Sequence, residues 1–271
     1  MNLPMYLKSI PIAGEDYELN LPKDHLSFSQ ISSYLRCPSY YYHDHVLGIE
    51  RKKSLALVEG LVHSQVIEES NLRRWKGKSS LSSKDAIRKY RAFFQEEIVG
   101  IDWASEDETE EDILDRMERF YLKMFSSDSK FSTSPETINN KPGVEYEWNK
   151  KYAGVEVVGR VDLIEQDTLW DIKCVKREPN PSTSLQLAFY ADVLQRSRVG
   201  FICLLKRKDP YVISPTAKLN LSLLPAVLES TVARVAQAIS LGIFTPCDSD
   251  NSWWCSEKMC SYWKGCRGFA V

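Results

Sequence analysis

The sequence predicts an α/β fold in which helices cover a small sheet. Apolar residues in the first half of the chain recur at the 3.6-residue spacing of helices. Residues 144–148 instead alternate between apolar and polar side chains, and further strand-like segments follow up to residue 175. Further helices follow, and a turn-rich tail at 244–271 carries several cysteines. Because no internal repeat divides the chain, we expect one domain over residues 1–271, with a helical insertion at about 76–140.

Four helices are expected before residue 126. Ser29 can cap the first, because a serine hydroxyl accepts a hydrogen bond from the backbone where a helix begins. An acidic run precedes the fourth and favours a helix N-terminus. The lead-in at 1–26 and the stretch at 126–143 are expected to be irregular. The four helices are expected at 29–47, 57–75, 83–98 and in a segment that ends near 125.

The second half of the chain predicts the sheet. Two strands at 155–164 and 169–175 are separated by a tight turn, so they are expected to pair. The remaining elements are a strand at 144–148, a helix at 183–197, a hairpin of 200–206 with 211–214, and a long helix at 221–241.

The amino-acid composition excludes some classes of function. The 271 residues include 35 Lys and Arg against 37 Asp and Glu, so the net charge of −2 excludes a histone-like coating protein. A local basic groove remains compatible with that balance. No apolar run reaches the roughly 18 residues of a membrane span, and the first residues lack a secretory signal. We therefore expect an intracellular, cytoplasmic protein without a membrane partner.

The densest chemistry lies in two predicted strands. Asp171 and Lys173 point to one face of their strand, and Asp162 lies on the strand before it. Cross-strand neighbours are about 5 Å apart, so the two aspartates can share one divalent cation of the Mg²⁺ or Mn²⁺ type. Lys173 beside such a cation completes a set suited to phosphodiester hydrolysis. An Asp–Lys pair on an exposed strand often only pairs in solvent, but the apolar flanks here indicate a central strand.

Other side chains extend this set. Glu145 and Glu147 alternate on one face of the strand before Asp162, and either can supply a further carboxylate. Gln186 and Tyr190 are one helical turn apart, so their shared face can bond a phosphate or the Lys173 amine, or simply pack in the core.

Five motifs then follow in order: Gly60-x-x-His63, Glu145, Gly159-Arg160-x-Asp162, Asp171-x-Lys173 and Gln186-x-x-x-Tyr190. Together they resemble the RecB-type exonuclease branch of the PD-(D/E)XK nuclease superfamily. Leu26-Ser27-x-Ser29 and Tyr34-x-x-Cys37-Pro38 resemble the opening motif of its iron–sulfur members, which include AddB-like, CRISPR-associated RecB-like and phage exonucleases. The resemblance covers about residues 26–268.

The resemblance implies a restriction-endonuclease-like fold, in which helices flank a mixed central sheet. It implies that His63, Asp162 and Asp171 bind the metal and that Lys173 is the catalytic lysine. Glu145 matches the upstream acid, with Glu147 as a rival, and Gln186 with Tyr190 would support the lysine and contact DNA. The implied catalytic set is therefore Asp162, Asp171, Lys173, Glu145, His63, Gln186 and Tyr190.

The cysteines suggest a second metal centre. Seven is an odd count for a disulfide framework, and the cluster near the C-terminus indicates a metal in a reducing compartment. The tail has Cys255-x₄-Cys260-x₅-Cys266, and the resemblance implies that Cys37 joins these three to hold a [4Fe–4S] cluster. The family spacing between the first two tail cysteines is usually two residues, so Zn²⁺ and unligated buried thiols remain alternatives, and Cys247 is a spare thiol.

The sequence thus predicts a Mg²⁺- or Mn²⁺-dependent DNA nuclease. An exonuclease acting on single-stranded DNA or free ends is expected, in recombination, repair or replication, with a protein partner from such a process and a phage-encoded origin in a bacterial host. Two other hypotheses stay open. One is a non-catalytic DNA-binding or scaffolding subunit with a relict nuclease site; the other is a structural protein whose active element is the cysteine tail.

Overall fold

A computed structural model describes residues 20–51, 53–103, 106–125, 133–207, 210–248, 250 and 252–267. The chain divides into two compact units. Residues 1–52, 148–159 and 222–271 belong to the first unit, and residues 53–147 and 160–221 belong to the second. The prediction of one domain with an insertion at 76–140 stays a prediction; the described part of that segment contains two helices of the second unit.

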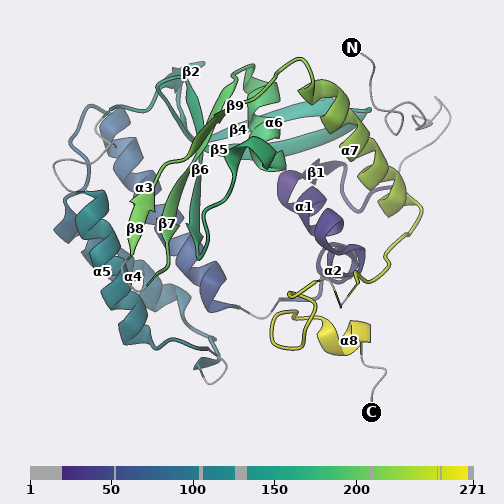
Figure 1. The fold of residues 1–271 in the computed structure, drawn as a ribbon, viewed down its shortest axis with the longest axis horizontal. Helices are drawn as coiled ribbons and strands as arrows, with labels where there is room; N and C mark the ends of the chain where they lie inside the picture. Colours follow the sequence, from purple (N-terminus) through teal and green to yellow (C-terminus); the bar gives the residue numbers. More distant parts are fainter. Residues whose placement is uncertain are drawn as a thin grey trace. The chain divides into compact units, whose positions relative to one another are not determined.

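A mixed sheet is the central element, as predicted from the sequence (Figure 1). Strand β6 is central in it, because it pairs antiparallel with β5 on one side and parallel with β7 on the other. A two-stranded sheet of β2 (Thr137–Ile138) and β3 (Lys141–Pro142) is separate. The strands of the main sheet are β1 (His25–Ser27), β4 (Val144–Tyr152), β5 (Val155–Glu165), β6 (Thr168–Val175), β7 (Arg198–Leu205), β8 (Tyr211–Ile213) and β9 (Thr216–Lys218).

Four α-helices of the second unit surround its strands; α3, α5 and α6 contact them, and α4 packs on α3 and α5. Helices α3 to α5 lie to one side of β6–β8 and α6 lies to the other (Figure 1). A serine or threonine side chain accepts a backbone hydrogen bond where each of them begins. The helix predicted at 183–197 is shorter because Gln195 takes a left-handed backbone (φ 54°) and ends it. The four helices are α3 (Leu55–Trp75), α4 (Ser83–Glu97), α5 (Glu110–Met124) and α6 (Leu185–Leu194), and the short 3₁₀ helix η4 (Pro181–Thr183) precedes α6.

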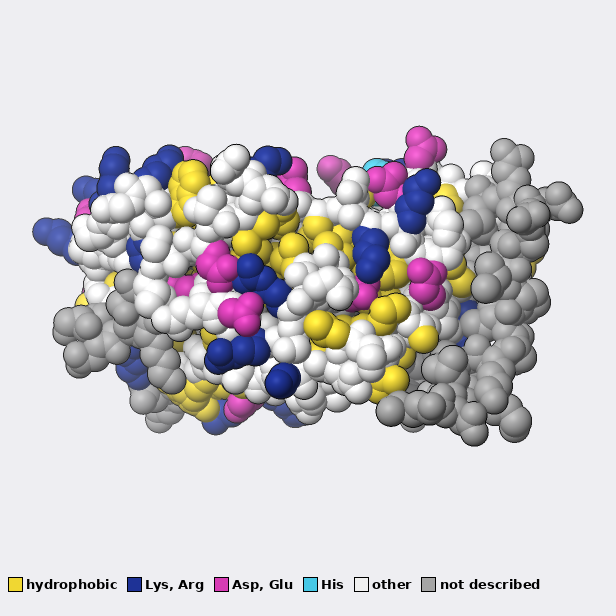
Figure 2. All heavy atoms as spheres, turned by 90° about the horizontal axis from the view of Figure 1, so that it is seen from above, with side chains coloured by type: hydrophobic (Ala, Val, Ile, Leu, Met, Phe, Trp, Pro, Cys, Tyr) yellow, Lys and Arg dark blue, Asp and Glu magenta, His cyan; other side chains and the backbone are white. Residues whose placement is uncertain are grey.

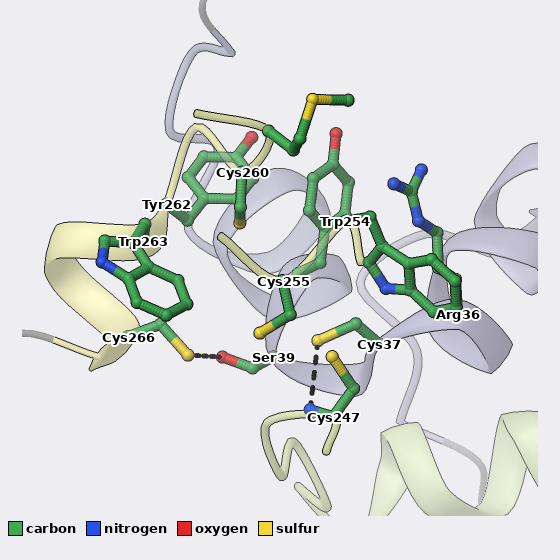
Figure 3. Close-up of a pocket in the computed structure, with 12 residues that line it drawn as sticks. Arg36, Cys37, Ser39, Cys247, Trp254, Cys255, Cys260, Tyr262, Trp263 and Cys266 are labelled. Atoms are coloured by element: carbon green, nitrogen blue, oxygen red, sulfur yellow. Dashed lines mark hydrogen bonds between the residues drawn. The ribbon is translucent and has the colours of Figure 1, made fainter. Parts of the chain in front are cut away.

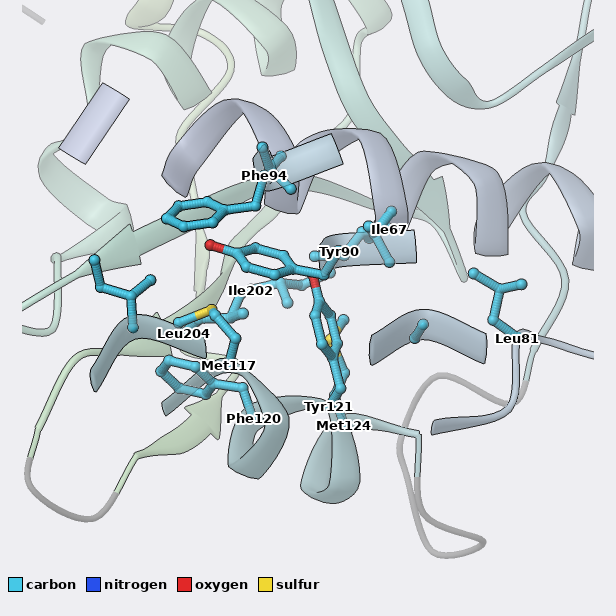
Figure 4. Packing of buried hydrophobic residues seen from close by; sticks show 14 of the residues in the cluster. Ile67, Leu81, Tyr90, Phe94, Met117, Phe120, Tyr121, Met124, Ile202 and Leu204 are labelled. Carbon is cyan, nitrogen blue, oxygen red and sulfur yellow. The ribbon is translucent and has the colours of Figure 1, made fainter. Parts of the chain in front are cut away.

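Aromatic side chains fill the core between α3, α4 and α5. Tyr90, Phe94, Phe120 and Tyr121 gather there against aliphatic residues of β7 (Figure 4). Each of these four rings is at most 1% exposed. Burial of such rings contributes about 2–3 kcal/mol each, so this core fixes the three helices on the sheet.

A buried ion network ties the same elements together. Glu59 of α3 accepts hydrogen bonds from Arg116 of α5 at 2.5 Å and from Lys206 after β7 at 2.7 Å. Burial alone raises the pKa of Glu59, but the two cations hold that pKa below its usual value. The network therefore keeps the carboxylate charged inside the fold.

Helices of the first unit differ from the prediction. The single helix expected at 29–47 is broken at Cys37, whose backbone is extended because Pro38 follows it. The N-cap is Ser27 rather than Ser29, in a capping box with Gln30. Within the lead-in expected to be irregular, His25–Ser27 forms β1 and pairs with β5; residues 1–19 lie outside the described residues. The helical elements are α1 (Phe28–Arg36), α2 (Pro38–Tyr41), the π-helix η2 (Tyr42–Val46), α7 (Leu224–Ser240) and α8 (Trp263–Arg267).

Two glycines of the second unit have opposite surroundings. A Cβ on Gly200 of β7 would lie 2.5 Å from the ring of Trp170, its cross-strand partner, so packing explains that glycine. A Cβ on Gly60, inside α3, would meet no atom within 4 Å. Glycine in a helix interior costs roughly 0.5–1 kcal/mol relative to alanine, and the packing of the fold offers no reason for it at position 60.

The surface charge is mixed. On the face drawn in Figure 2, Lys and Arg side chains lie among Asp and Glu side chains, in keeping with the near-balanced composition. Among the described helices, none combines the length and hydropathy needed to cross a membrane.

Candidate active site

Two aspartates face each other across β5 and β6. The register pairs Leu163 with Trp170, so Asp162 lies opposite Asp171. The Ile172 amide donates to Asp162 Oδ2 at 2.7 Å, which fixes that carboxylate. Asp171 is 1% exposed, and the Lys173 ammonium lies 2.8 Å from its Oδ2 and 3.1 Å from its Oδ1. The three residues predicted to form the catalytic core therefore meet in one place.

Glu145 joins this group through an unusual backbone. It has φ +46° within β4, a left-handed conformation that costs a non-glycine residue roughly 1–3 kcal/mol. Its carboxylate lies near that of Asp171, and Arg160 Nη1 is 3.7 Å from its Oε2. Glu147, the rival from the sequence, is exposed. The structure thus brings Glu145, and not Glu147, to the two aspartates.

The acids of this cluster resist ionisation. Burial, followed by the nearby Asp171 carboxylate, raises the pKa of Asp162 to about 8. Burial also raises the pKa of Asp171, against the lowering effect of Lys173. The pKa of Glu145 is raised by burial and then by Glu68 of α3, whereas Arg160 and the Ser64 hydroxyl lower it. Crowded, largely desolvated carboxylates with one lysine among them are a donor set that a hard divalent cation stabilises.

The oxygens of these carboxylates are not arranged around one common point, as the ligands of a bound metal ion would be. Over the described residues, no group of three or more His, Cys, Asp or Glu side chains has the arrangement of a metal site. The donor types nevertheless fit Mg²⁺ or Mn²⁺, since all are carboxylate oxygens. A cation at this position would have to draw Asp162, Asp171 and Glu145 closer together.

Helix α6 holds the lysine. Gln186 Oε1 accepts a hydrogen bond from Lys173 Nζ at 3.0 Å, and Gln186 Nε2 donates to the Tyr190 hydroxyl at 2.7 Å. Tyr190 is 1% exposed, and burial raises its pKa, as do Asp162 and Asp171 nearby. The chain from Tyr190 through Gln186 to Lys173 therefore positions the ammonium beside Asp171.

His63 lies elsewhere. Its imidazole is 1% exposed, bonds the Tyr121 hydroxyl through Nδ1 at 2.8 Å and contacts the ring of Tyr90. Burial lowers the pKa of His63 to about 3, and Lys206 and Arg116 act in the same direction against Glu59. The structure does not bring this predicted ligand to the acidic cluster, because its face of α3 packs in the aromatic core.

The face of α3 that does reach the cluster carries Ser64 and Glu68, which the sequence analysis missed. They act on Glu145, as its pKa shows. The available signal was their spacing of four residues, which continues from Gly60 along one helix face.

The cysteines meet in a pocket of the first unit (Figure 3). Cys37 comes from the junction of α1 and α2, and the others come from the tail. Burial raises the pKa of Cys260; the Tyr262 backbone lowers it, and three further thiols, those of Cys37, Cys255 and Cys266, raise it again. The four thiols named from the sequence are therefore close enough to feel one another's charge.

Cys247 also lines this pocket. Its backbone amide donates to Cys37 Sγ at 3.4 Å, while Ser39 Oγ lies 3.2 Å from Cys266 Sγ (Figure 3). The cavity among the side chains is about 20 Å³, room for roughly one water-sized group. As the side chains stand, this cavity fits a single ion more readily than a four-iron cluster, for which the tail would have to move outward.

The mixed sheet thus presents two aspartates and a lysine on adjacent strands. A family model described as the PD-(D/E)XK nuclease superfamily matches residues 25–267. The chain therefore belongs to the PD-(D/E)XK nuclease superfamily.

One solved structure agrees with this fold over the whole chain. The chain is similar to a protein described as a "putative exonuclease" from Eubacterium rectale, at 12% identity and a TM-score of 0.56, with 100% of this chain and 94% of that chain covered. A structure described as SSO0001 aligns at 17% identity over 47% of this chain and 61% of that one, and its TM-score of 0.32 is too low to support an argument. The comparison with curated proteins gave no match.

The first prediction separates the two glutamates of β4. Glu145→Gln removes a carboxylate that faces the aspartates, so we expect Mn²⁺ binding, measured by isothermal titration calorimetry, to weaken at least about tenfold. Glu147→Gln, the matched control on the same strand, changes an exposed side chain and should leave the affinity within about twofold. Equal effects of the two substitutions would contradict the assignment of Glu145.

The second prediction concerns acid stability. The pKa of His63 is about 3 in the folded state and 6.5 in a free side chain, so only the unfolded chain takes up this proton between those values. The contribution of His63 to stability is present above pH 6.5 and is lost as pH falls toward 3. We measure the free energy of unfolding in urea as a function of pH. This free energy should fall more steeply with decreasing pH for the native protein than for His63→Phe, and the two slopes should differ by up to about 1.4 kcal/mol per pH unit. Parallel profiles would show that the imidazole is not buried as described.

Proposed function

We propose that this chain is a Mg²⁺- or Mn²⁺-dependent deoxyribonuclease that hydrolyses DNA from its ends. The observation that carries this proposal is the meeting of Asp162, Asp171 and Lys173 beside Glu145, in a chain of the PD-(D/E)XK superfamily. A bound divalent cation lowers the pKa of a water molecule and offsets phosphate charge. The exonuclease assignment is supported by the motif pattern and by the name of the structural relative.

The protein residues have separate roles in this proposal. Asp162, Asp171 and Glu145 hold the cation with their carboxylate oxygens, and Glu68 is an additional acid at its edge. Lys173 is 36% exposed at its side chain, so its ammonium can also reach a phosphate oxygen and stabilise the charge that develops there. His63 is left out of the ligand set because its imidazole faces the core.

Gln186 and Tyr190 act through Lys173. Gln186 accepts one hydrogen bond from the ammonium, and the Tyr190 hydroxyl orients the Gln186 amide. This arrangement limits the rotation of a long side chain before substrate arrives, which lowers the entropy cost of placing its charge. We also propose that the setting is intracellular DNA end processing in recombination, repair or replication.

The thiol pocket is proposed to hold a structural metal group. Cys37, Cys255, Cys260 and Cys266 would bind a [4Fe–4S] cluster, with Zn²⁺ as the alternative that the small cavity favours. Such a crosslink joins Cys37 to a tail about 220 residues later, which stabilises the fold by about 5 kcal/mol in the chain-entropy treatment.

The third prediction tests the nuclease. With labelled DNA and Mg²⁺ or Mn²⁺, Lys173→Ala should cut about 10²- to 10⁴-fold more slowly than the native protein, because it lacks the positioned ammonium. Lys176→Ala, in which an exposed lysine three residues further along is lost, is the matched control and should cut normally.

Native protein should degrade open DNA and spare the same DNA with blocked ends. Equal cutting by both lysine variants, or DNA binding without any cutting by native protein, would instead support a non-catalytic subunit.

The fourth prediction identifies the metal of the thiol pocket. Anaerobically purified protein should contain about four irons and absorb near 400 nm if the cluster is present, whereas a colourless protein with one zinc would establish the alternative. Cys260→Ser should abolish metal retention and lower the melting temperature. Cys247→Ser, the control within the same pocket, should keep the metal, since Cys247 is outside the proposed four. Loss of metal in Cys247→Ser alone would show that the ligand set is wrong.

A further inference from the structure

One face of helix α3 borders the acidic cluster and is open to solvent. Three of its residues, Leu57, Gly60 and Leu61, form what we call the α3 stripe. Leu57 is 52% exposed and Leu61 is 43% exposed, although both are large apolar side chains. Gly60 and Leu61 follow Leu57 by three and four residues, so these positions lie on one side of the helix.

The α3 stripe leads directly into the site. The same helix face continues to Ser64 and Glu68, which act on the Glu145 carboxylate. At 1.5 Å per residue, Leu61 lies about 4.5 Å and Leu57 about 10 Å along the helix axis from Ser64. These spans correspond to about one and two nucleotides of a strand that passes over the proposed cation site.

Gly60 gives an independent observation. A side chain at this position would meet nothing within 4 Å, so neither packing nor backbone conformation requires glycine. Glycine in the middle of a helix weakens it. What glycine provides here is bare backbone between two exposed leucines, which lets another molecule come close to the helix.

We infer that the α3 stripe binds an unpaired nucleotide of the DNA strand next to the cleaved bond, with its sugar and base against the two leucines and its closest approach at Gly60. This inference rests on the proposed nuclease function. The stripe contains no lysine or arginine, so it offers nothing to a phosphate, but it suits the apolar faces of sugars and bases. In a duplex those base faces are stacked and covered, so the stripe favours a single strand.

The size of the stripe argues against a protein occupant. A stable protein interface buries about 800 Å² on each partner. Two half-exposed leucines and a glycine offer far less than that area, whether to another protein or to a second copy of this chain. A nucleotide matches the size of the stripe and its position beside the cluster.

The experiment compares matched leucine substitutions. Leu57→Gln/Leu61→Gln removes the apolar contact, and Leu122→Gln changes a leucine of α5 that is equally exposed at 52%. We expect the stripe variant to raise KM for a single-stranded oligonucleotide about tenfold, as lost apolar burial predicts, with kcat nearly unchanged. Cleavage of bis(p-nitrophenyl) phosphate, which has no nucleoside to contact the stripe, should be unaffected, and Leu122→Gln should behave as native protein. An unchanged KM, or the same loss in Leu122→Gln, would overturn the inference.

Gly60→Ala separates a binding role from a structural one. It should raise the melting temperature, by about 2 °C, and yet lower kcat/KM for single-stranded DNA several-fold. A variant that is more stable and equally active would contradict the role of Gly60.

Binding without added metal keeps this test apart from the test of catalysis. Native protein that cuts nothing would defeat the proposed function. Affinity for a fluorescein-labelled oligonucleotide would still decide the inference, because it needs no turnover. A loss of about tenfold in the stripe variant, and none in Leu122→Gln, would support it. Equal affinities, or a native dimer that the stripe variant dissociates, would overturn it.

Discussion

The structure of the site depends on one constraint: a buried aspartate, Asp171, and a partly buried one, Asp162, lie opposite each other on paired strands. The register of β5 and β6 fixes their separation, and burial keeps water away from Asp171. Two neighbouring groups offset part of the free-energy cost of holding these charges away from water, and a third adds to it. The Ile172 amide binds Asp162, the Lys173 ammonium binds Asp171, and Glu145 adds a third acid where repulsion is already high. Ionisation of both aspartates is therefore costly unless positive charge lies beside them.

Backbone strain also points to the acidic cluster as a functional site. Glu145 is held in a left-handed conformation at the second residue of β4, where a glycine would avoid the cost. Two regular strand neighbours, Glu145 and Glu147, would leave the sheet on the same side, and the altered backbone is what separates them. Strain of this kind persists where the surrounding structure enforces it, and it concentrates at functional sites.

The sequence predicted those parts of the site that depend on strict periodicity. Alternation along β6 was enough to place Asp171 and Lys173 on one face, and a four-residue spacing was enough to pair Gln186 with Tyr190. Residue spacing was not enough to identify the residue of α3 that faces the acids, because neighbouring residues of a helix point about 100° apart. The motif there ends on His63, yet the face toward the acids belongs to Ser64 and Glu68. Which residue of a helix faces a sheet is decided by tertiary packing, here by the aromatic core that takes up His63. The helix break at Cys37 and Pro38 had a signal in the sequence, because a proline disfavours helical backbone in the residue before it. The prediction instead followed the apolar helical spacing around that proline and therefore gave one continuous helix.

The two candidate metal centres differ in chemistry in a way that keeps them independent. The second unit gathers carboxylate oxygens around a lysine, and the first unit gathers thiols among aromatic rings. Hard cations such as Mg²⁺ prefer the oxygens, whereas iron and zinc prefer thiolates. Because the thiol pocket offers no carboxylate among its lining residues, a cation of the catalytic type gains little by binding there. In the proposed function, this segregation of donor types would let the thiol pocket keep its metal while the carboxylates exchange theirs with solvent.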